Sequence, residues 1–328
     1  MAARLQARVT VRVRPFADQD YSAYARIRTI GEREPTDAAG AREADARWDR
    51  SRYERVRVVA VDEEDAPVGY GEIHHEPSRF EPGRYFIRLA VDPEKRRRGI
   101  GAALWSRLHA ELTERKAQVA CLWSDDHTAC LPFIARRGFR EVIRSYRMVC
   151  AVATAPQPTE AQAELLAREG VTVTTLADLM RDDDRAAQKA HALDFAARAD
   201  QPTLGRVTLA PFETWFAYHV EDPAALPEAH FVATIGGVYV GVSGGRRGAS
   251  DDVLDIGITA VLPLYRRRGI ARALKLRLHA YARAEGYREI HTSNTRENVP
   301  MVKLNESLGY VIVESWGGYE LTLIPSSP

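Results

Sequence analysis

Two stretches decide the fold of this chain: Ala90–Ala110, AVDPEKRRRGIGAALWSRLHA, and Ala260–Ala280, AVLPLYRRRGIARALKLRLHA. They align without a gap at a constant offset of 170 residues, and about two thirds of their positions are identical. An arginine-rich chain can repeat RRR by chance. It does not also repeat, in register, the preceding Ala-Val-x-Pro and the following Arg-Leu-His-Ala. A long internal repeat of this kind indicates two copies of one structural unit.

Length and composition agree with two globular domains. The 328 residues are too many for one ordinary core, and a domain commonly has about 150 residues. Residues are 45% hydrophobic and 28% charged, and 46 Lys and Arg nearly balance 45 Asp and Glu. This balance argues against nucleic acid or a membrane as a partner. We expect domains at 1–154 and 170–328, joined by a linker at 155–169 that becomes helical near 160–168.

The sequence around each stretch predicts the same order of elements in both halves. An opening strand and an acidic helical region are followed by a hairpin, a central strand, the repeated turn, a long helix, a strand and a short helix. The expected strands are Val9–Val13, Val56–Val61, Val68–His74, Tyr85–Val91 and Gln118–Ser124, then Val171–Thr175, His230–Ile235, Val238–Ser243, Val253–Val261 and Glu289–Asn294. This order predicts an α/β fold in which each half has a mixed sheet with a strand–helix–strand crossover.

The repeated turn has the properties of an anion site. Pro93 or Pro263 ends the strand, and the helix that follows begins with N–H groups that have no intrahelical partner. Gly99 or Gly269 lets the backbone approach a ligand closely. With the positive end of the helix and three arginines, the turn predicts a pyrophosphate site. The alternative is a plain turn with a solvated basic face. No Gly-Lys-Ser/Thr follows, which argues against a P-loop, and the preceding chain does not suit a dinucleotide-binding βαβ unit.

The pattern Val-x-Pro-x-x-Arg-x-x-Gly-x-Gly/Ala resembles the acyl-CoA-binding motif of the GNAT N-acetyltransferase superfamily, and two-domain members in particular. The resemblance covers nearly the whole chain apart from the linker. It implies acetyl-CoA (coenzyme A) as the cofactor and direct acetyl transfer to a primary amine of a small molecule or peptide. The residues that it implies for acetyl-CoA are Leu89, Ala90, Val91, Arg96, Arg97, Arg98, Gly99, Ile100, Gly101 and Ala102, and Ala260, Val261, Arg266, Arg267, Arg268, Gly269, Ile270, Ala271, Arg272, Asn294, Asn298 and Met301.

The two halves differ after the long helix. Family members often have an Asn that contacts CoA and, seven residues later, a Tyr that protonates the departing thiolate. Counting back from Gly309 puts Asn298 and Asn305 at these places, and counting back from Gly138 puts His127 and Ile134 there. Neither half has the Tyr. Asn298 equally suits a helix N-cap.

The polar run from Asn294 to Asn305 favours the C-terminal half as the catalytic one and the N-terminal half as a degenerate copy. The opposite assignment stays open, because Gly101 suits the turn better than Ala271 and Glu72, His74 and His75 lie nearby in sequence. We expect these two histidines at exposed positions of a half-polar strand.

An amine must lose a proton before it attacks a thioester, so a carboxylate or an imidazole is expected as the base. Asp255, on the central strand, and His291, on the next strand, are the candidates, and Asn305 stands at the place of the family's Tyr. Strand alternation puts Asp255, Gly257 and Thr259 on one face. By analogy with the family, a backbone N–H near Val261 holds the oxyanion.

Other features exclude several classes. Cys121, Cys130 and Cys150 form no pair at metal spacing, which predicts reduced thiols and no metal site. No apolar run has the length of a signal peptide or a membrane span, so we expect a cytoplasmic protein. We expect it to be a monomer or a homodimer. The alternative function is a non-catalytic acyl-CoA-binding sensor or scaffold, which the absence of both tyrosines would favour.

Overall fold

The computed structural model describes residues 11–31, 36–126 and 130–323. Its described residues form two compact units: unit 1 holds 11–124, 130–141 and 319–323, and unit 2 holds 125–126 and 142–318. These units differ from the predicted cut near residue 155. Strand β6 (Arg140–Ala151) begins in unit 1 and continues in unit 2, while β12 (Val311–Thr322) passes from unit 2 to unit 1 at Tyr319. The predicted boundaries follow the two sequence repeats. They do not include the strands that pass between units, because the pattern of a strand does not reveal which sheet it joins.

Unit 1 contains a mixed sheet in the order β1-β2-β3-β4-β5. Pairing is antiparallel from β1 to β4 and parallel between β4 and β5. At the end of β12, the Leu323 N–H donates to the Gln118 carbonyl at 2.8 Å. The bounds are β1 (Arg12–Pro15), β2 (Arg55–Val61), β3 (Pro67–His74), β4 (Arg84–Val91) and β5 (Val119–Asp125).

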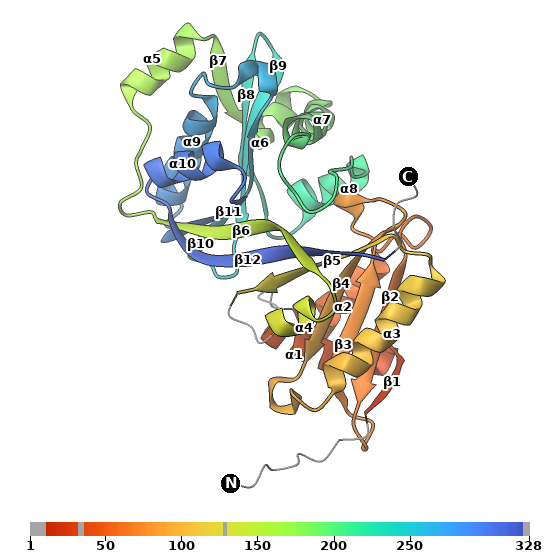
Figure 1. Cartoon of the computed structure of the whole chain (residues 1–328). Helices are drawn as coiled ribbons and strands as arrows, with labels where there is room; N and C mark the ends of the chain where they lie inside the picture. Colours follow the sequence, from red (N-terminus) through yellow and green to blue (C-terminus); the bar gives the residue numbers. More distant parts are fainter. Residues whose placement is uncertain (1–10, 32–35, 127–129, 324–328) are drawn as a thin grey trace. The chain divides into compact units, whose positions relative to one another are not determined.

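Helices cover both faces of this sheet (Figure 1). Helix α3 (Ile100–Glu114) lies on one face, and α1 (Tyr21–Gly31) with α2 (Ala38–Ala46) lies on the other. Alternation along β2 sends Val58 toward α3 and Val59 toward α1. The short helix α4 (Leu131–Ala135) follows β5 in the chain.

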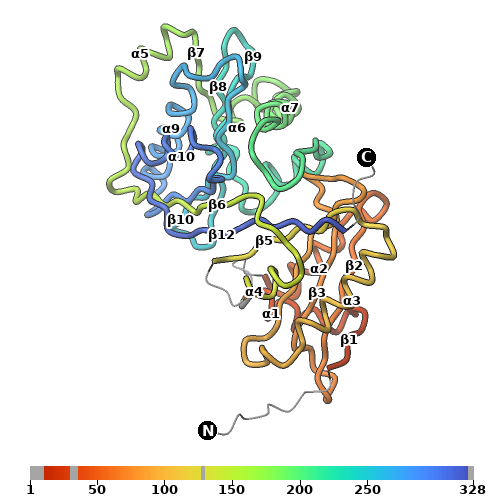
Figure 2. Tube along the Cα trace, viewed as in Figure 1, coloured from red at the N-terminus to blue at the C-terminus, as the bar shows by residue number. Residues whose placement is uncertain are grey.

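Unit 2 repeats this plan in the strand order β12-β6-β11-β10-β9-β8-β7. In Figures 1 and 2, α7 lies on one side of β8 and β9, and α9 lies on the other side. Strands β10 and β11 are parallel, as β4 and β5 are in unit 1. The strands are β7 (Val171–Thr175), β8 (Ala225–Ile235), β9 (Val238–Arg247), β10 (Val253–Val261) and β11 (Glu289–Thr295), and the helices are α5 (Glu160–Arg168), α6 (Leu176–Asp182), α7 (Ala186–Arg198), α8 (Phe212–Phe216), α9 (Ile270–Ala284) and α10 (Val299–Ser307).

Most predicted elements are confirmed. β7 and β10 have the predicted bounds, and the predicted linker helix is α5, whose first turn is capped by the Thr159 side chain. The first predicted strand is displaced to Arg12–Pro15, and Val9 and Thr10 lie outside the described residues. Among the described helices, none has the length and apolarity that crossing a membrane would require.

Candidate functional site

In each unit the central parallel pair of strands separates partway along. The pairing of β4 with β5 stops at Phe86, and that of β10 with β11 stops at Ile256. Beyond these points the described residues of β4 and β10 continue to Val91 and Val261 without a partner on that side. Backbone groups along the gap are therefore available to a ligand.

The repeated turn leads from each separated strand into a helix. Arg97 and Arg267 both have a φ of 66°, and Gly99 and Gly269 have φ values of 88° and 77°. The first helical bond of α9 runs from the Ala273 N–H to the Gly269 carbonyl at 3.0 Å, so the amides just before it have no helical acceptor. Left-handed residues beside a helix start form a concave set of N–H donors that suits an anion. Non-glycine residues held at positive φ often mark functional turns.

A cavity of about 390 Å³ opens at this turn in unit 2. The separated strand β10, the turn, the end of α7 and the start of α10 build its walls. The lining residues are Ala197, Asp200, Gln201, Pro202, Thr259, Ala260, Val261, Tyr265, Arg266, Arg267, Gly269, Ile270, Ala271, Arg272, Asn298, Pro300, Met301 and Leu304. The size lies within the range of small-molecule sites.

Most residues predicted for the cofactor in the second half lie in this wall. Arg268 does not, and its guanidinium lies 3.5 Å from the Glu169 carboxylate. Asn294 does not either, although its Nδ2 is buried without a hydrogen-bond partner among the described residues. Asn298 occupies the N-cap position of α10 but makes no side-chain cap bond.

Arg266 joins the strand to the turn. Its Nε donates to the Val261 carbonyl at 2.9 Å, and its two terminal nitrogens donate to Asp200 at 2.5 and 2.8 Å. The ion pair lowers the pKa of Asp200 and raises that of Arg266. In unit 1 the Arg96 Nε donates to the Val91 carbonyl at 3.1 Å in the same way. This first arginine of each RRR therefore shapes the turn.

Strand β10 contains a β-bulge at Gly257. Its pairing with β9 shifts between Ile256 and Ile258, which leaves Gly257 as the extra residue. Before the bulge Leu254 and Ile256 pack into the core under α9, and after it Ile258 and Ala260 pack against α7. The prediction that Asp255, Gly257 and Thr259 share one face is therefore wrong, because an extra residue reverses the alternation.

The bulge brings Thr259 to the α9 side, where it lines the cavity. Its hydroxyl lies 2.7 Å from the buried Ser243 hydroxyl, which also lies 3.3 Å from the Ile258 carbonyl. In unit 1 the residues with the same pairing are Leu89 and Gly71. Sequence reasoning missed this hydroxyl pair, although the change from Leu89 to Thr259 at the offset of 170 residues was a readable signal.

The three predicted catalytic residues lie away from the cavity wall. Asp255 and His291 are brought side by side by the parallel register. Asp255 is four residues before Thr259, about 13 Å along a strand, and the His291 Nε2 lies 2.8 Å from Glu289. Asn305 is fully buried, with its Nδ2 3.6 Å from the Met148 sulfur, so it does not face a ligand in this cavity.

A buried histidine on β8 was also missed. His230 pairs across the sheet with Gly244, and its ring covers that glycine so closely that a Cβ there would lie 2.7 Å from its Nδ1. The His230 Nε2 is buried without a hydrogen-bond partner among the described residues. Burial lowers its pKa to about 4, which keeps the ring neutral at pH 7. The sequence of β8 alone gives no signal for this site, because the glycine opposite His230 is set by the register between β8 and β9.

In unit 1 an aromatic side chain narrows the corresponding space. Phe133 stands where Leu304 stands in unit 2, five residues before the glycine that ends the short helix. A Cβ on Gly101 would lie 3.4 Å from its ring, and the Arg137 guanidinium lies 3.3 Å from the ring centroid on a face. Ile134 is buried in the core, and His127 lies outside the described residues.

The predicted cofactor residues of unit 1 divide between core and turn. Leu89, Ala90, Val91 and Ile100 pack into its cores, whereas Arg96, Arg97, Arg98, Gly99 and Ala102 are exposed. The expectation that His74 and His75 are exposed is wrong, since they are 4% and 3% exposed. Aromatic side chains pack around both rings: Trp48 and Phe86 around His74, and Phe80 and Tyr85 around His75. Glu72 is also buried, and its carboxylate accepts from the Arg57 Nε at 2.7 Å.

The acetyltransferase (GNAT) family matches the chain twice, at residues 23–139 and 190–310. Among curated proteins, a mycothiol acetyltransferase from a Nocardioides species is 27% identical over 238 residues, which cover 68% of this chain and 76% of that protein. A mycothiol acetyltransferase from Thermobispora bispora is 30% identical over 233 residues, which cover 68% and 71%.

Solved structures share the fold. A GCN5-related N-acetyltransferase from Sphaerobacter thermophilus matches with a TM-score of 0.70 and 19% identity, covering 98% of both chains. A tandem GNAT protein from the clavulanic acid biosynthesis pathway matches with a TM-score of 0.70 and 17% identity, covering 97% of this chain and 100% of its own. Two family matches, two turns of one geometry and two separated strand pairs agree. The chain therefore belongs to the acetyltransferase (GNAT) family and is a tandem N-acetyltransferase.

Proposed function

We propose that unit 2 transfers an acetyl group from acetyl-CoA to a primary amine of a small molecule or peptide. The observation that carries the proposal is the cavity of about 390 Å³, which joins the anion-binding turn to the separated strand β10. Acetyl-CoA, when bound, would supply the acetyl group as a thioester. The name of the curated relatives makes mycothiol-related amines the first acceptor class to test.

The wall of the cavity suits the chemistry of such a donor. Amide N–H groups of the turn, with Arg267 and Arg272, provide positive charge and donors for a diphosphate. Pro300, Met301 and Leu304 provide an apolar surface for an uncharged arm. The same wall therefore offers one charged and one apolar part, as an acyl-CoA requires.

Thr259 is the side chain that we assign to the leaving group. Its hydroxyl is held by Ser243 at 2.7 Å and lies on the cavity side of β10. A hydroxyl is too weak an acid to protonate a thiolate outright. When the Ser243 hydroxyl donates to Thr259 rather than to the Ile258 carbonyl, the Thr259 proton is left for a hydrogen bond to sulfur, which would stabilise the negative charge that develops there. Solvent would then supply the proton.

A base is still needed for the amine. Asp255 and His291 remain predictions for this role. His230 is a third candidate, because its neutral ring lies over Gly244, the β9 residue that pairs with Ile258 of β10, and its Nε2 is without a partner among the described residues. A neutral imidazole has one nitrogen lone pair that can accept a proton.

Unit 1 is proposed to be a degenerate copy. It keeps the turn, but Leu89 and Gly71 replace the hydroxyl pair and Phe133 lies against Gly101. These replacements remove the polar group beside the strand and narrow the space along the helix. The proposal therefore assigns turnover to unit 2 alone.

Matched substitutions in the two turns test the assignment. Arg267→Gln and Arg97→Gln remove the same side chain at the same φ of 66° in unit 2 and unit 1. We expect Arg267→Gln to lower CoA release with an amine panel by about tenfold and Arg97→Gln to leave it near wild type. Calorimetry with acetyl-CoA gives the stoichiometry in the same proteins.

Two outcomes would contradict the proposal. Loss of turnover in Arg97→Gln with normal turnover in Arg267→Gln would move the active site to unit 1. Acetyl-CoA binding without thiol release across the panel would favour the acyl-CoA sensor.

A further inference from the structure

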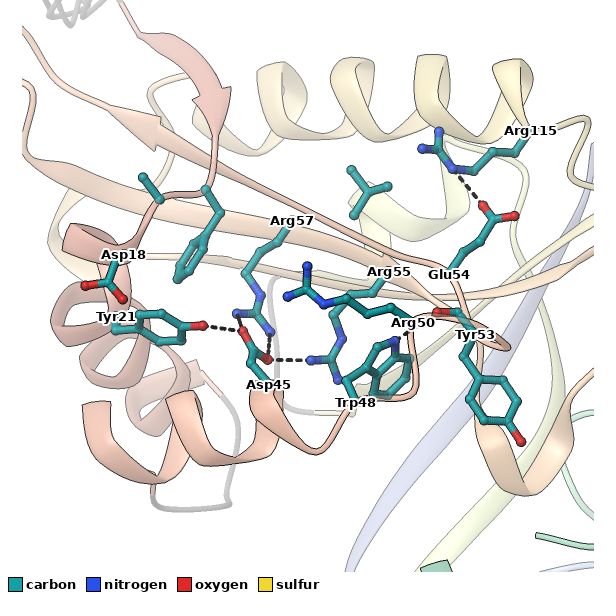
Figure 3. Close-up of a pocket in the computed structure, with 13 residues that line it drawn as sticks. Asp18, Tyr21, Asp45, Trp48, Arg50, Tyr53, Glu54, Arg55, Arg57 and Arg115 are labelled. Carbon is teal, nitrogen blue, oxygen red and sulfur yellow. Dashed lines mark hydrogen bonds and ion pairs between the residues drawn. The ribbon is translucent and has the colours of Figure 1, made fainter. Parts of the chain in front are cut away.

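Unit 1 contains a hollow that lies away from its repeated turn. The hollow has a volume of about 500 Å³ and lies where β1 ends at Pro15 while β2 continues back to Arg55 (Figure 3). We call it the Arg50 hollow, and its walls include Phe16, Tyr21, Trp48, Arg50, Arg55 and Arg57. No residue of the repeated turn lines it.

Most charges in this wall already have partners. Asp45 accepts from Arg55 at 2.5 Å, from both terminal nitrogens of Arg57 at 2.9 and 3.1 Å, and from the Tyr21 hydroxyl at 2.6 Å. The third nitrogen of Arg57 donates to Glu72 at 2.7 Å. These bonds hold the guanidinium groups of Arg55 and Arg57 in place in the wall of the hollow.

The remaining carboxylates are also paired. Asp18 accepts from Arg42 at 3.1 Å, and Glu54 lies 3.0 Å from the Arg115 Nε. Arg50 is different, because among the described residues no carboxylate is paired with it, and its guanidinium points into the hollow in Figure 3. Asp45 and Glu72 together match the charges of Arg55 and Arg57. Glu54 matches Arg115, and Asp18 is matched by Arg42, so the positive charge of Arg50 is left without compensation.

Apolar surface lies beside this charge. Phe16, Tyr21 and Val56 line the hollow, and one face of the Trp48 ring is covered by the Arg55 guanidinium at 3.6 Å from the ring centroid. A ligand here would meet a single free guanidinium and an aromatic and aliphatic wall. A planar carboxylate matches the guanidinium fork and its single charge, whereas a phosphate dianion would bring a charge that nothing compensates.

We propose that the Arg50 hollow binds a small monocarboxylate with an apolar or aromatic body. The proposal goes beyond acetyl transfer and does not depend on it. It gives unit 1, the copy without the hydroxyl pair, a ligand site of its own.

Calorimetric titration of the full chain with phenylacetate tests the proposal. Phenylacetamide serves as the neutral analogue, and inorganic phosphate serves as an anion that has no apolar group. We expect phenylacetate to bind wild type and to bind Arg50→Gln at least about tenfold more weakly. The control Arg47→Gln removes an exposed arginine that is bonded to Glu43 outside the hollow, and it is expected to bind like wild type.

Several results would overturn the proposal. They are no heat with phenylacetate, equal binding by Arg50→Gln and wild type, equal binding of phenylacetamide, or tighter binding of phosphate. Circular dichroism of Arg50→Gln shows that lost binding does not come from lost folding, and the exposed position of Arg50 makes folding of this variant expected.

Discussion

Replacing Lys275 with Met is expected to stabilise unit 2, by an amount that shrinks as pH rises. Lys275 lies on α9 and is 1% exposed, and its Nζ has no hydrogen-bond partner among the described residues. The Tyr310 ring, whose centroid lies 4.9 Å from the Nζ, and the Cys150 thiol offset only part of the cost of burying this charge. Burial lowers the pKa of Lys275 from 10.5 to about 7. Met has a similar length and no charge, so it fills the site without this cost.

The magnitude follows from proton linkage. Between about pH 7 and pH 10.5 the unfolded chain holds a proton on Lys275 that the folded chain has lost, so the free energy of unfolding of wild type rises with pH. The full slope is about 1.4 kcal/mol per pH unit, and close to the folded pKa it is roughly half of that. The advantage of the Met variant should therefore be constant below about pH 6 and shrink by about 1 kcal/mol from pH 7 to pH 8. The charge of Lys275 lowers the pKa of His279 and of Cys150, so removing it changes both groups. Between pH 6 and 8 the folded wild type nevertheless keeps both uncharged, because burial lowers the pKa of His279 to about 4 and raises that of Cys150.

The assay is urea unfolding at pH 6, 7 and 8. Hydrogen exchange of peptides from β10 and α9 monitors the unfolding. These peptides report unit 2 alone, which matters because two units need not unfold in one step. Lys303→Met is the control, since Lys303 is exposed in the same unit. Parallel pH profiles of wild type and Lys275→Met, or a Met variant less stable than wild type at pH 6, would refute the reasoning.

Three further outcomes are expected. Gly244→Ala should lower the free energy of unfolding by about 1–3 kcal/mol, because the new Cβ would lie 2.7 Å from the His230 Nδ1. Gly257→Ala should lower it less in the same thermal unfolding assay, because no atom lies within 4 Å of its Cβ. Equal losses in the two variants would contradict this. Thr259→Val should lower kcat by about tenfold or more with a smaller change in KM for acetyl-CoA, while Thr259→Ser keeps most activity; unchanged kcat in the Val variant would remove Thr259 from the mechanism. Burial lowers the pKa of His230 and of His279 to about 4, so the unfolded chain binds more protons between about pH 4 and 6.5 and stability should fall as pH falls through that window; a flat profile in calorimetry would contradict it.

Local patterns in the sequence predicted the elements well. The spacing of apolar residues and the positions of Pro and Gly gave β7, β10 and α5 their bounds, because these signals act within a few residues. The turn was predictable for the same reason. Its glycine and the doubled sequence determine a local conformation, which recurs at Arg97 and Arg267 with the same φ.

Features that depend on distant partners were not predictable in this way. A bulge at Gly257 changes which side of the sheet Thr259 faces, and nothing within β10 alone indicates it. Asn305 stands at the place of the family's Tyr, yet packing around Met148 buries it completely. His230 acquires its environment only when β9 places a glycine opposite it.

The crossing of strand ends between the units has a consequence for dividing the protein. A break near residue 155 would yield a first fragment that keeps the β6 residues paired with β11 in unit 2, and a second fragment that keeps residues 319–323 of unit 1. Neither fragment could complete its own sheet. The two sequence repeats are therefore not independent folding units. Fragments cut near residue 155 should regain native structure only when both are produced together in one cell.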